Sequence, residues 1–216
     1  MGDDWYRTPD WSVEAQDAFE EKLKRSRRHN RPQYLRIKAL ALLQTDEKEN
    51  RHAGRELLRR LVQDYPDSFD VSWAQEFLAN AYREEGQAVE AEALYRAALR
   101  TYEINPNVKG YAHLGLAALI LDTAQDSKYE EMEVLLDSLD PTSDLALRNA
   151  QFKWSVLRAR LATRLGKQED ARQFASAGLR LAELDEPQFP RHPDVAQIQP
   201  EDAALDELRR LAGEAP

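Results

Sequence analysis

Cysteine is absent from this chain of 216 residues, and glycine occurs at only 8 positions. Without cysteine the chain can have no disulfide framework, no thiolate nucleophile and no cysteine-based zinc site. No apolar run is long enough to span a bilayer. The first residues, MGDDWYRTPDW, also lack the basic-then-apolar order of a secretory signal. We therefore expect a cytoplasmic protein with no membrane partner.

The charge of the chain is strongly unbalanced towards acid. Its formal net charge is −9 and its pI is about 5.1, which disfavours nonspecific attraction to nucleic acid or to anionic lipid. Charged residues make up 32% of the sequence, and with glycine so scarce this predicts helices with solvated faces. No segment indicates a β-sheet.

Motifs for catalysis and for metal or cofactor binding are missing from the sequence. It contains no phosphate-binding glycine loop, no dinucleotide fingerprint, no H-E-x-x-H and no G-x-S-x-G. The four histidines, His29, His52, His113 and His192, are far apart in the sequence. Acidic pairs such as Glu84-Glu85 are typical of solvated helix faces. The sequence therefore predicts neither an enzyme nor a bound cofactor or metal.

The clearest pattern in the chain lies between Ser72 and Pro106. Apolar residues recur there at spacings of three and four, which places them on one stripe of each of two helices joined near Gly86. The first stripe contains Phe77, Leu78 and Tyr82, and the second contains Ala91, Leu94, Tyr95, Ala98 and Leu99. The pattern predicts a helical hairpin with small residues at its closest approach.

This hairpin resembles a tetratricopeptide repeat. The resemblance rests on Leu78-Ala79, Tyr82, the turn glycine Gly86, Ala91, Tyr95 and Ala98. It implies an all-α, right-handed solenoid of stacked hairpins. It also implies that the first helices of successive repeats line a concave groove in which a protein or peptide binds.

Three further segments match the pattern less closely, and the four repeats are expected at about 34–67, 72–106, 108–141 and 145–184. In the third, Leu114-Gly115 takes the place of Leu78-Ala79, and Ser127 takes that of Ala91. In the fourth, counting back from Gly166 aligns Arg158-Ala159 with Leu78-Ala79, whereas counting from Trp154 aligns Leu157-Arg158. Both registers remain open at this point.

The ends of the chain differ from the repeats. Residues 1–33 are expected to form an aromatic lead-in and a capping helix that follows Ser12 and runs to about Arg28. Residues 185–216 combine a segment with four prolines, which favour an extended path, and a last capping helix over Glu201–Ala212. Capped ends favour a monomer.

A basic run, KLKRSRRHNR, extends from Lys22 to Arg31. One interpretation is a contact with nucleic acid or with an acidic protein. The other is a solvated helix end whose cations oppose the negative end of the helix dipole. We favour the second, because no aromatic residue interleaves the run.

The resemblance also assigns residues to the groove. The expected partner-binding residues are Lys38, Leu42, Trp73, Glu76, Asn80, Arg83, Lys109, His113, Leu116, Lys153 and Arg160, with Arg164 beside them. In the variant of the family that grips a terminal carboxylate, a lysine stands where this chain has Glu76. We therefore do not expect carboxylate-terminus binding by that route.

Cations outnumber acids among these groove residues, which suggests an acidic peptide or acidic protein surface as ligand. The alternative is that the cations pair with local acids along the helices. We expect a non-catalytic adaptor or scaffold. Two other functions remain open: a peptide-sensing regulator that switches a partner, and a weakly RNA-binding helical array.

The predicted helix over Val108–Leu121 is apolar almost all round, so it should be buried on every side. We expect an intramolecular lid over Leu116 and Leu119. It would come from residues 185–200, through Phe189, Val195 and Ile198, or from the lead-in with Trp5 and Trp11. The alternatives are ordinary burial between repeats and an open patch for a partner helix.

Overall fold

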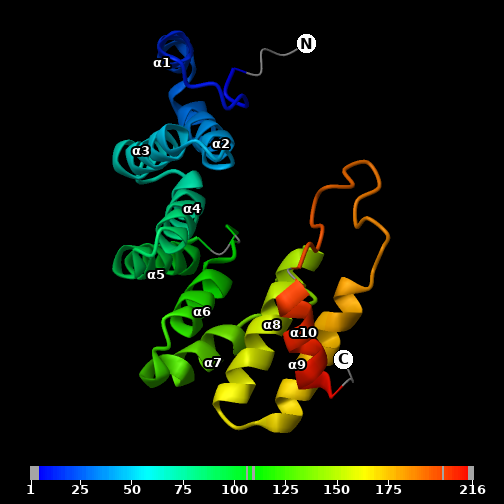
Figure 1. Ribbon diagram of the computed structural model, residues 1–216. Helices are drawn as coiled ribbons and strands as arrows, with labels where there is room; N and C mark the ends of the chain where they lie inside the picture. The colour runs from blue at the N-terminus through cyan, green and yellow to red at the C-terminus, as the bar shows by residue number, and fades with distance from the viewer. Residues whose placement is uncertain (1–4, 106, 109, 201, 214–216) are drawn as a thin grey trace. The chain divides into compact units, whose positions relative to one another are not determined.

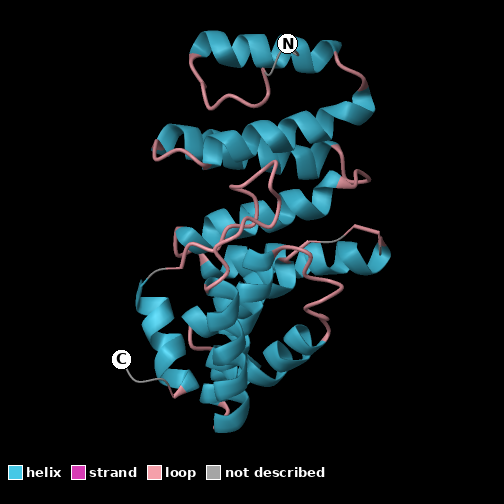
Figure 2. Ribbon diagram, turned by 90° about the vertical axis from the view of Figure 1, so that its right-hand side faces the viewer, coloured by secondary structure: helices cyan, strands magenta, loops and turns pink. Residues whose placement is uncertain are grey.

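The computed structural model describes residues 5–105, 107–108, 110–200 and 202–213. Within these ranges the protein is all-helical, with ten α-helices, two 3-10 helices and no strand (Figures 1 and 2). The all-α prediction is therefore confirmed. The chain divides into two compact units, Met1–Ala112 and His113–Pro216, and each is described here by itself.

The first unit contains five α-helices in its described part. They are α1 (Val13–Arg25), α2 (Arg31–Leu43), α3 (Lys48–Asp64), α4 (Asp70–Glu84) and α5 (Ala88–Ile104), with a 3-10 helix over Arg28–Asn30. As predicted, Ser12 caps α1, because its hydroxyl accepts a hydrogen bond from the Ala15 amide at 3.3 Å. The helix ends at Arg25, slightly before the expected end at about Arg28.

Consecutive helices of this unit pack against one another: α2 on α3, α3 on α4, and α4 on α5. The α2–α3 contact is close because Gly54 has no side chain. A Cβ at that position would lie 2.9 Å from the Ala39 carbonyl oxygen and 2.9 Å from Leu43 Cγ. The buried small residue at this contact is therefore Gly54, whereas its neighbour Ala53 is only partly buried.

The second unit is entered through α6 (Ala112–Asp122), which begins at the last residue of the first unit. A 3-10 helix over Asp126–Lys128 and helices α7 (Tyr129–Asp137), α8 (Arg148–Arg164), α9 (Gln168–Ala182) and α10 (Asp202–Ala212) follow. Helices α8 and α9 pack side by side, and α10 packs on α9. Leu208 of α10 is buried against Gly178, where an added Cβ would lie 3.2 Å from a Leu208 methyl carbon.

The same turn joins α4 to α5, α6 to the 3-10 helix before α7, and α8 to α9. Its central residue has a positive φ in each case: 75° at Gly86, 49° at Ala124 and 72° at Gly166. The backbone hydrogen bonds around all three residues follow one pattern. For example, the amides of Gln87, Gln125 and Lys167 bond to the carbonyls of Tyr82, Ile120 and Ala162. This shared turn fixes the relative register of the three helix pairs.

Counting back seven residues from each turn residue gives Ala79, Ala117 and Ala159, and none of the three is exposed to solvent. Counting forward five gives Ala91, Tyr129 and Ala171, all of which are buried. In the segment predicted as the fourth repeat, the count from Gly166 therefore agrees with the structure, and Ala159 corresponds to Ala79.

The register predicted for the third repeat was wrong by two residues. The structure aligns Leu116-Ala117, and not Leu114-Gly115, with Leu78-Ala79, and Tyr129 replaces Ser127 as the counterpart of Ala91. The shift arises because Ala124 occupies the left-handed position that the sequence pattern assigns to glycine.

Arg158 occupies the position that Leu78 holds in α4. Its guanidinium carbon lies 4.6 Å from the ring centroid of Phe174 and 5.7 Å from that of Trp154, and the group pairs with Asp137. The aromatic rings and the carboxylate allow an arginine to replace a core leucine, because they solvate its charge while its stem is covered.

Candidate binding surfaces

The predicted groove residues of α2 are buried. Lys38 is 1% exposed and Leu42 is fully covered. The Lys38 ammonium donates hydrogen bonds to the backbone carbonyls of Thr8 and Asp10, each at 2.8 Å. It also lies 5.3 Å from the ring centroid of Trp11. The lead-in therefore covers the face of α2 that was predicted to be open to a partner.

The lead-in is held to this unit by polar and by aromatic contacts. The Asn50 side-chain amide of α3 donates to the Pro9 carbonyl at 3.1 Å. Trp5 packs against Phe19 of α1 and Tyr34 of α2, with ring centroids 5.2 and 5.1 Å apart. Burial lowers the pKa of Lys38, while the charge of Asp10 acts in the opposite direction. The lead-in thus folds back within its own unit, where the helix that it covers is α2.

On α4, two predicted groove residues bond within the unit. The buried Glu76 carboxylate accepts hydrogen bonds from the Tyr102 hydroxyl at 2.7 Å and from the Tyr111 amide at 2.9 Å. Asn80 accepts one from the Tyr95 hydroxyl at 2.6 Å. Burial, together with the nearby Glu76 charge, raises the pKa of Tyr102. Glu76 therefore anchors the chain that follows α5 and is covered by it.

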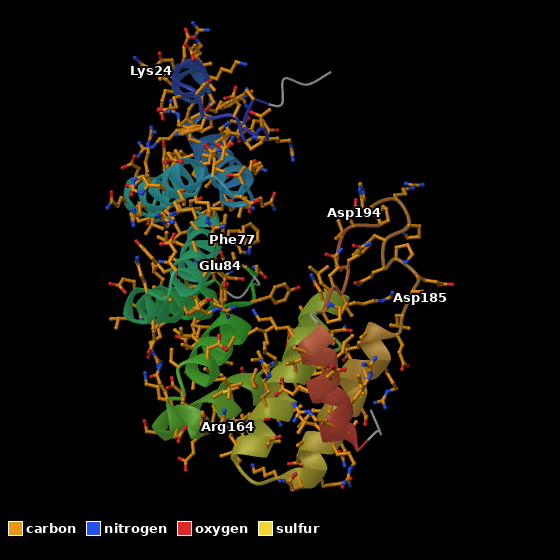
Figure 3. The ribbon with its side chains drawn as sticks, viewed as in Figure 1. Lys24, Phe77, Glu84, Arg164, Asp185 and Asp194 are labelled. Carbon is orange, nitrogen blue, oxygen red and sulfur yellow. The ribbon has the colours of Figure 1, made fainter. Side chains whose placement is uncertain are left out.

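Trp73, Asn80 and Arg83 are the predicted groove residues of α4 that stay partly exposed, and the Asn80 side chain is already bonded to Tyr95. The guanidinium of Arg36 lies 4.7 Å from the ring centroid of Trp73, and it pairs with Asp70 at 2.6 Å. The Arg36 guanidinium and the Trp73 ring thus hold each other in place at the start of α4. Figure 3 labels Phe77 and Glu84 on the same helix. This is the part of the predicted groove in the first unit that a partner can reach.

The third group of predicted residues is only partly accessible. Lys109 lies outside the described residues. Leu116 is fully buried and corresponds to Leu78 of α4, which is also buried. It therefore belongs to the core and not to an open surface. His113 is partly covered, and burial lowers its pKa against the opposing effect of Asp144.

The predicted lid over α6 is wrong for residues 185–200. Phe189 and Val195 are 38% and 45% exposed. The segment instead meets the start of α8, where the Gln188 side chain accepts from the Arg148 amide at 2.8 Å and donates to the Ala146 carbonyl at 2.7 Å. Leu116 and Leu119 are nevertheless buried, as the apolar character of α6 predicted.

In the second unit, Lys153 and Arg160 lie on α8 and both are partly exposed. The Arg160 guanidinium makes two hydrogen bonds to Glu207 of α10, at 3.0 and 2.6 Å. Arg164 is exposed one turn further along the helix (Figure 3). A hollow of about 610 Å³ opens beside these residues, lined by Leu121, Asp122, Arg160, Thr163, Arg164 and Glu207.

Two of the cations on which the hypothesis of an acidic ligand rested are bound to internal partners. Lys38 is bound by backbone carbonyls, and Arg160 is bound by Glu207. Both contacts are with segments distant in sequence, whereas the alternative considered from the sequence was pairing along one helix. Arg164 keeps its charge at the surface.

No group of three or more histidine or acidic residues in the described parts of the chain is placed to hold a metal ion. No described helix has the length and apolar character needed to cross a membrane. Comparison with models of known protein families and with curated proteins found no match to this chain.

Proposed function

We propose that this protein is a non-catalytic binding module of tetratricopeptide-like helical hairpins, acting as an adaptor or scaffold. The observation that carries the proposal is the shared turn at Gly86, Ala124 and Gly166, with a solvent-excluded alanine seven residues before each. Hairpins related in this way present their first helices repeatedly, and repeat proteins use such surfaces to bind peptides or proteins.

The accessible part of each first helix supplies the binding residues in this proposal. In the first unit they are Trp73 and Arg83 of α4, and in the second they are Lys153 and Arg164 of α8. The α8 surface also has a hollow of about 610 Å³, large enough to take several side chains of a peptide. Lys38, Leu42, Glu76 and Leu116 instead stabilise the fold.

Selection from a displayed library of random peptides tests this function. We expect an enriched sequence family that binds the full chain saturably, and we expect weaker binding after Arg164→Ala. The matched control is Arg180→Ala, which removes an exposed arginine from the second helix of the same pair, α9. Failure to enrich any family, or equal loss of binding in both variants, would contradict the proposal.

A further inference from the structure

The basic run Lys22–Arg31 contains none of the predicted groove residues. It contains six of the 30 lysines and arginines of the chain and no acidic residue, while the rest of the chain carries the other 24 against 39 acids. It forms the last turns of α1, the 3-10 helix after it and the first residue of α2. A concentrated positive surface on an acidic protein attracts oppositely charged partners specifically to that place.

Three members of the run already have internal contacts. Arg25 pairs with Glu21 one helical turn earlier. The Arg31 guanidinium donates to the carbonyls of Ser26 and Lys24, at 3.2 and 2.8 Å, and so caps the end of α1. The Lys22 ammonium lies 6.0 Å from the ring centroid of Trp5.

The other cations of the run are not used in this way. The side chains of Lys24, Arg27 and Arg28 are exposed, and they make no ion pair or hydrogen bond with any described residue (Figure 3 labels Lys24). A helix C-terminus needs only one or two cations to offset its dipole, and Arg31 already satisfies carbonyls there. The three cations therefore remain available to a ligand.

The fold also brings aromatic side chains to this run, which the sequence alone did not indicate. A hollow of about 630 Å³ lies beside Arg28, lined by Arg28, His29, Pro32, Asp64, Tyr65, Pro66, Asp67, Ser68 and Phe69. Phe69, at the start of α4, is 67% exposed. Arg28 lines this hollow together with Tyr65 and Phe69, while Lys24 and Arg27 precede Arg28 closely in the sequence. Such an arrangement can hold an apolar anchor and adjacent carboxylates together.

We propose that the corner formed by Lys24, Arg27, Arg28 and the hollow beside Phe69 binds a short acidic segment of a partner protein, one with an aromatic or aliphatic residue among its acids. Its carboxylates pair with the three cations, and its apolar residue enters the hollow. The proposal deepens the binding function proposed above and adds a site separate from the first-helix surfaces.

Two features of the corner favour an acidic peptide over a nucleic acid or an anionic membrane. Asp64 and Asp67 line the hollow, where they disfavour any anionic group but can accept hydrogen bonds from the backbone amides beside the apolar residue that enters it. The acidic excess of the remaining chain also opposes a long polyanion or an extended anionic surface more than it opposes a short peptide.

The test uses the full chain and a fluorescein-labelled peptide, DDEFEDD, with DDEGEDD as the probe that lacks the anchor. Fluorescence anisotropy should show saturable binding of the first probe, with affinity falling as sodium chloride rises from about 50 to about 300 mM. The double variant R27E/R28E should bind about tenfold more weakly. Phe69→Ala should weaken binding of DDEFEDD but leave binding of DDEGEDD unchanged.

The matched control is R209E/R210E, which makes the same change of charge at two exposed positions of α10 and should bind like the unmodified chain. An equal loss of peptide affinity in both double variants would show that the effect comes from net charge alone, and it would overturn the proposal. So would equal affinity for the two peptides.

The other two classes of anionic partner are tested in parallel arms. Two results would overturn the proposal in favour of the other partner, provided that R27E/R28E abolishes them. One is binding of labelled oligothymidine that is tighter than binding of DDEFEDD. The other is co-sedimentation of the protein with phosphatidylserine vesicles when it does not bind the peptide. If DDEFEDD fails to bind at all, the corner proposal falls. The first-helix surfaces, tested by Arg164→Ala, would still stand.

Discussion

At the scale of single residues, Lys38 differs most from its predicted role. The family resemblance placed this lysine in the groove, facing a ligand, and it is instead enclosed by the carbonyls of Thr8 and Asp10. Helix periodicity could not reveal this, because its partners lie in an irregular segment with no periodic pattern. The aromatics Trp5 and Trp11 were the signal available in the sequence, since large apolar side chains near a chain end need a surface to cover.

Replacing Lys38 by methionine should destabilise the first unit. Methionine keeps the volume of the stem, but the carbonyls of Thr8 and Asp10 lose their buried donor, which costs about 1–3 kcal/mol. Urea unfolding followed by tryptophan fluorescence measures this loss. Lys24→Met, at an exposed position, should change stability by no more than about 0.5 kcal/mol. Equal midpoints for the two variants would show that the Lys38 contacts do not stabilise the fold.

His113 predicts a dependence of stability on pH. Burial lowers its pKa in the folded chain, so the unfolded chain binds the proton more readily below the ordinary value of 6.5. Stability should therefore fall as the pH is lowered through 6.5 towards the folded pKa.

The part of this loss that is due to His113 should disappear in His113→Asn. In the control His192→Asn, at an exposed position, it should persist. Urea midpoints measured at intervals between about pH 7.5 and about pH 5 give the comparison. An unmodified chain and a His113→Asn variant with parallel pH profiles would refute the assignment.

At the scale of helices and turns, the hydrophobic pattern predicted most of the architecture. The hairpin of α4 and α5 was correctly located, because Gly86 and the stripes beside it agree with one another. The third repeat was misregistered because its turn residue is Ala124, which carries no sequence signal for a positive φ. A left-handed turn at a residue that does not favour this conformation can be located only in the structure.

The three equivalent turns predict opposite effects of exchanging glycine and alanine. Gly86→Ala and Gly166→Ala should each destabilise the protein by about 1 kcal/mol, since a side chain disfavours the left-handed conformation although space is open there. Ala124→Gly should be neutral or stabilising by up to about 1 kcal/mol, because it relieves that conformation. Chemical denaturation of the three variants gives the values, and a loss of stability in Ala124→Gly would contradict the shared turn.

Helix α10 completes the packing of the second unit. Leu208 is 1% exposed and fills the space over Gly178. Leu208→Ala should therefore cost about 2–4 kcal/mol. Asp206→Ala, on an exposed part of the same helix, should cost less than about 0.5 kcal/mol. Thermal unfolding followed by circular dichroism compares them. A small loss in Leu208→Ala would mean that α10 does not cap the unit.

At the scale of the whole molecule, composition predicted the all-α fold class, and the helical periods predicted the packed helix pairs α2–α3, α4–α5 and α8–α9. The binding surface was harder to predict, because several residues at groove positions are used internally. Glu76, for example, is enclosed by Tyr102 and the backbone at Tyr111. Conversely, Arg28 gains its aromatic neighbours Tyr65 and Phe69 only when residues 65–69 fold beside it.

Hydrogen exchange of the full chain, with and without the strongest peptide from the library selection, tests the central proposal most directly. The account predicts slower exchange on binding in α4 or α8, the first helices of their pairs, while the exposed faces of α5 and α9 are unchanged. Protection confined to α5 or α9, or no protection at a saturating peptide concentration, would contradict it.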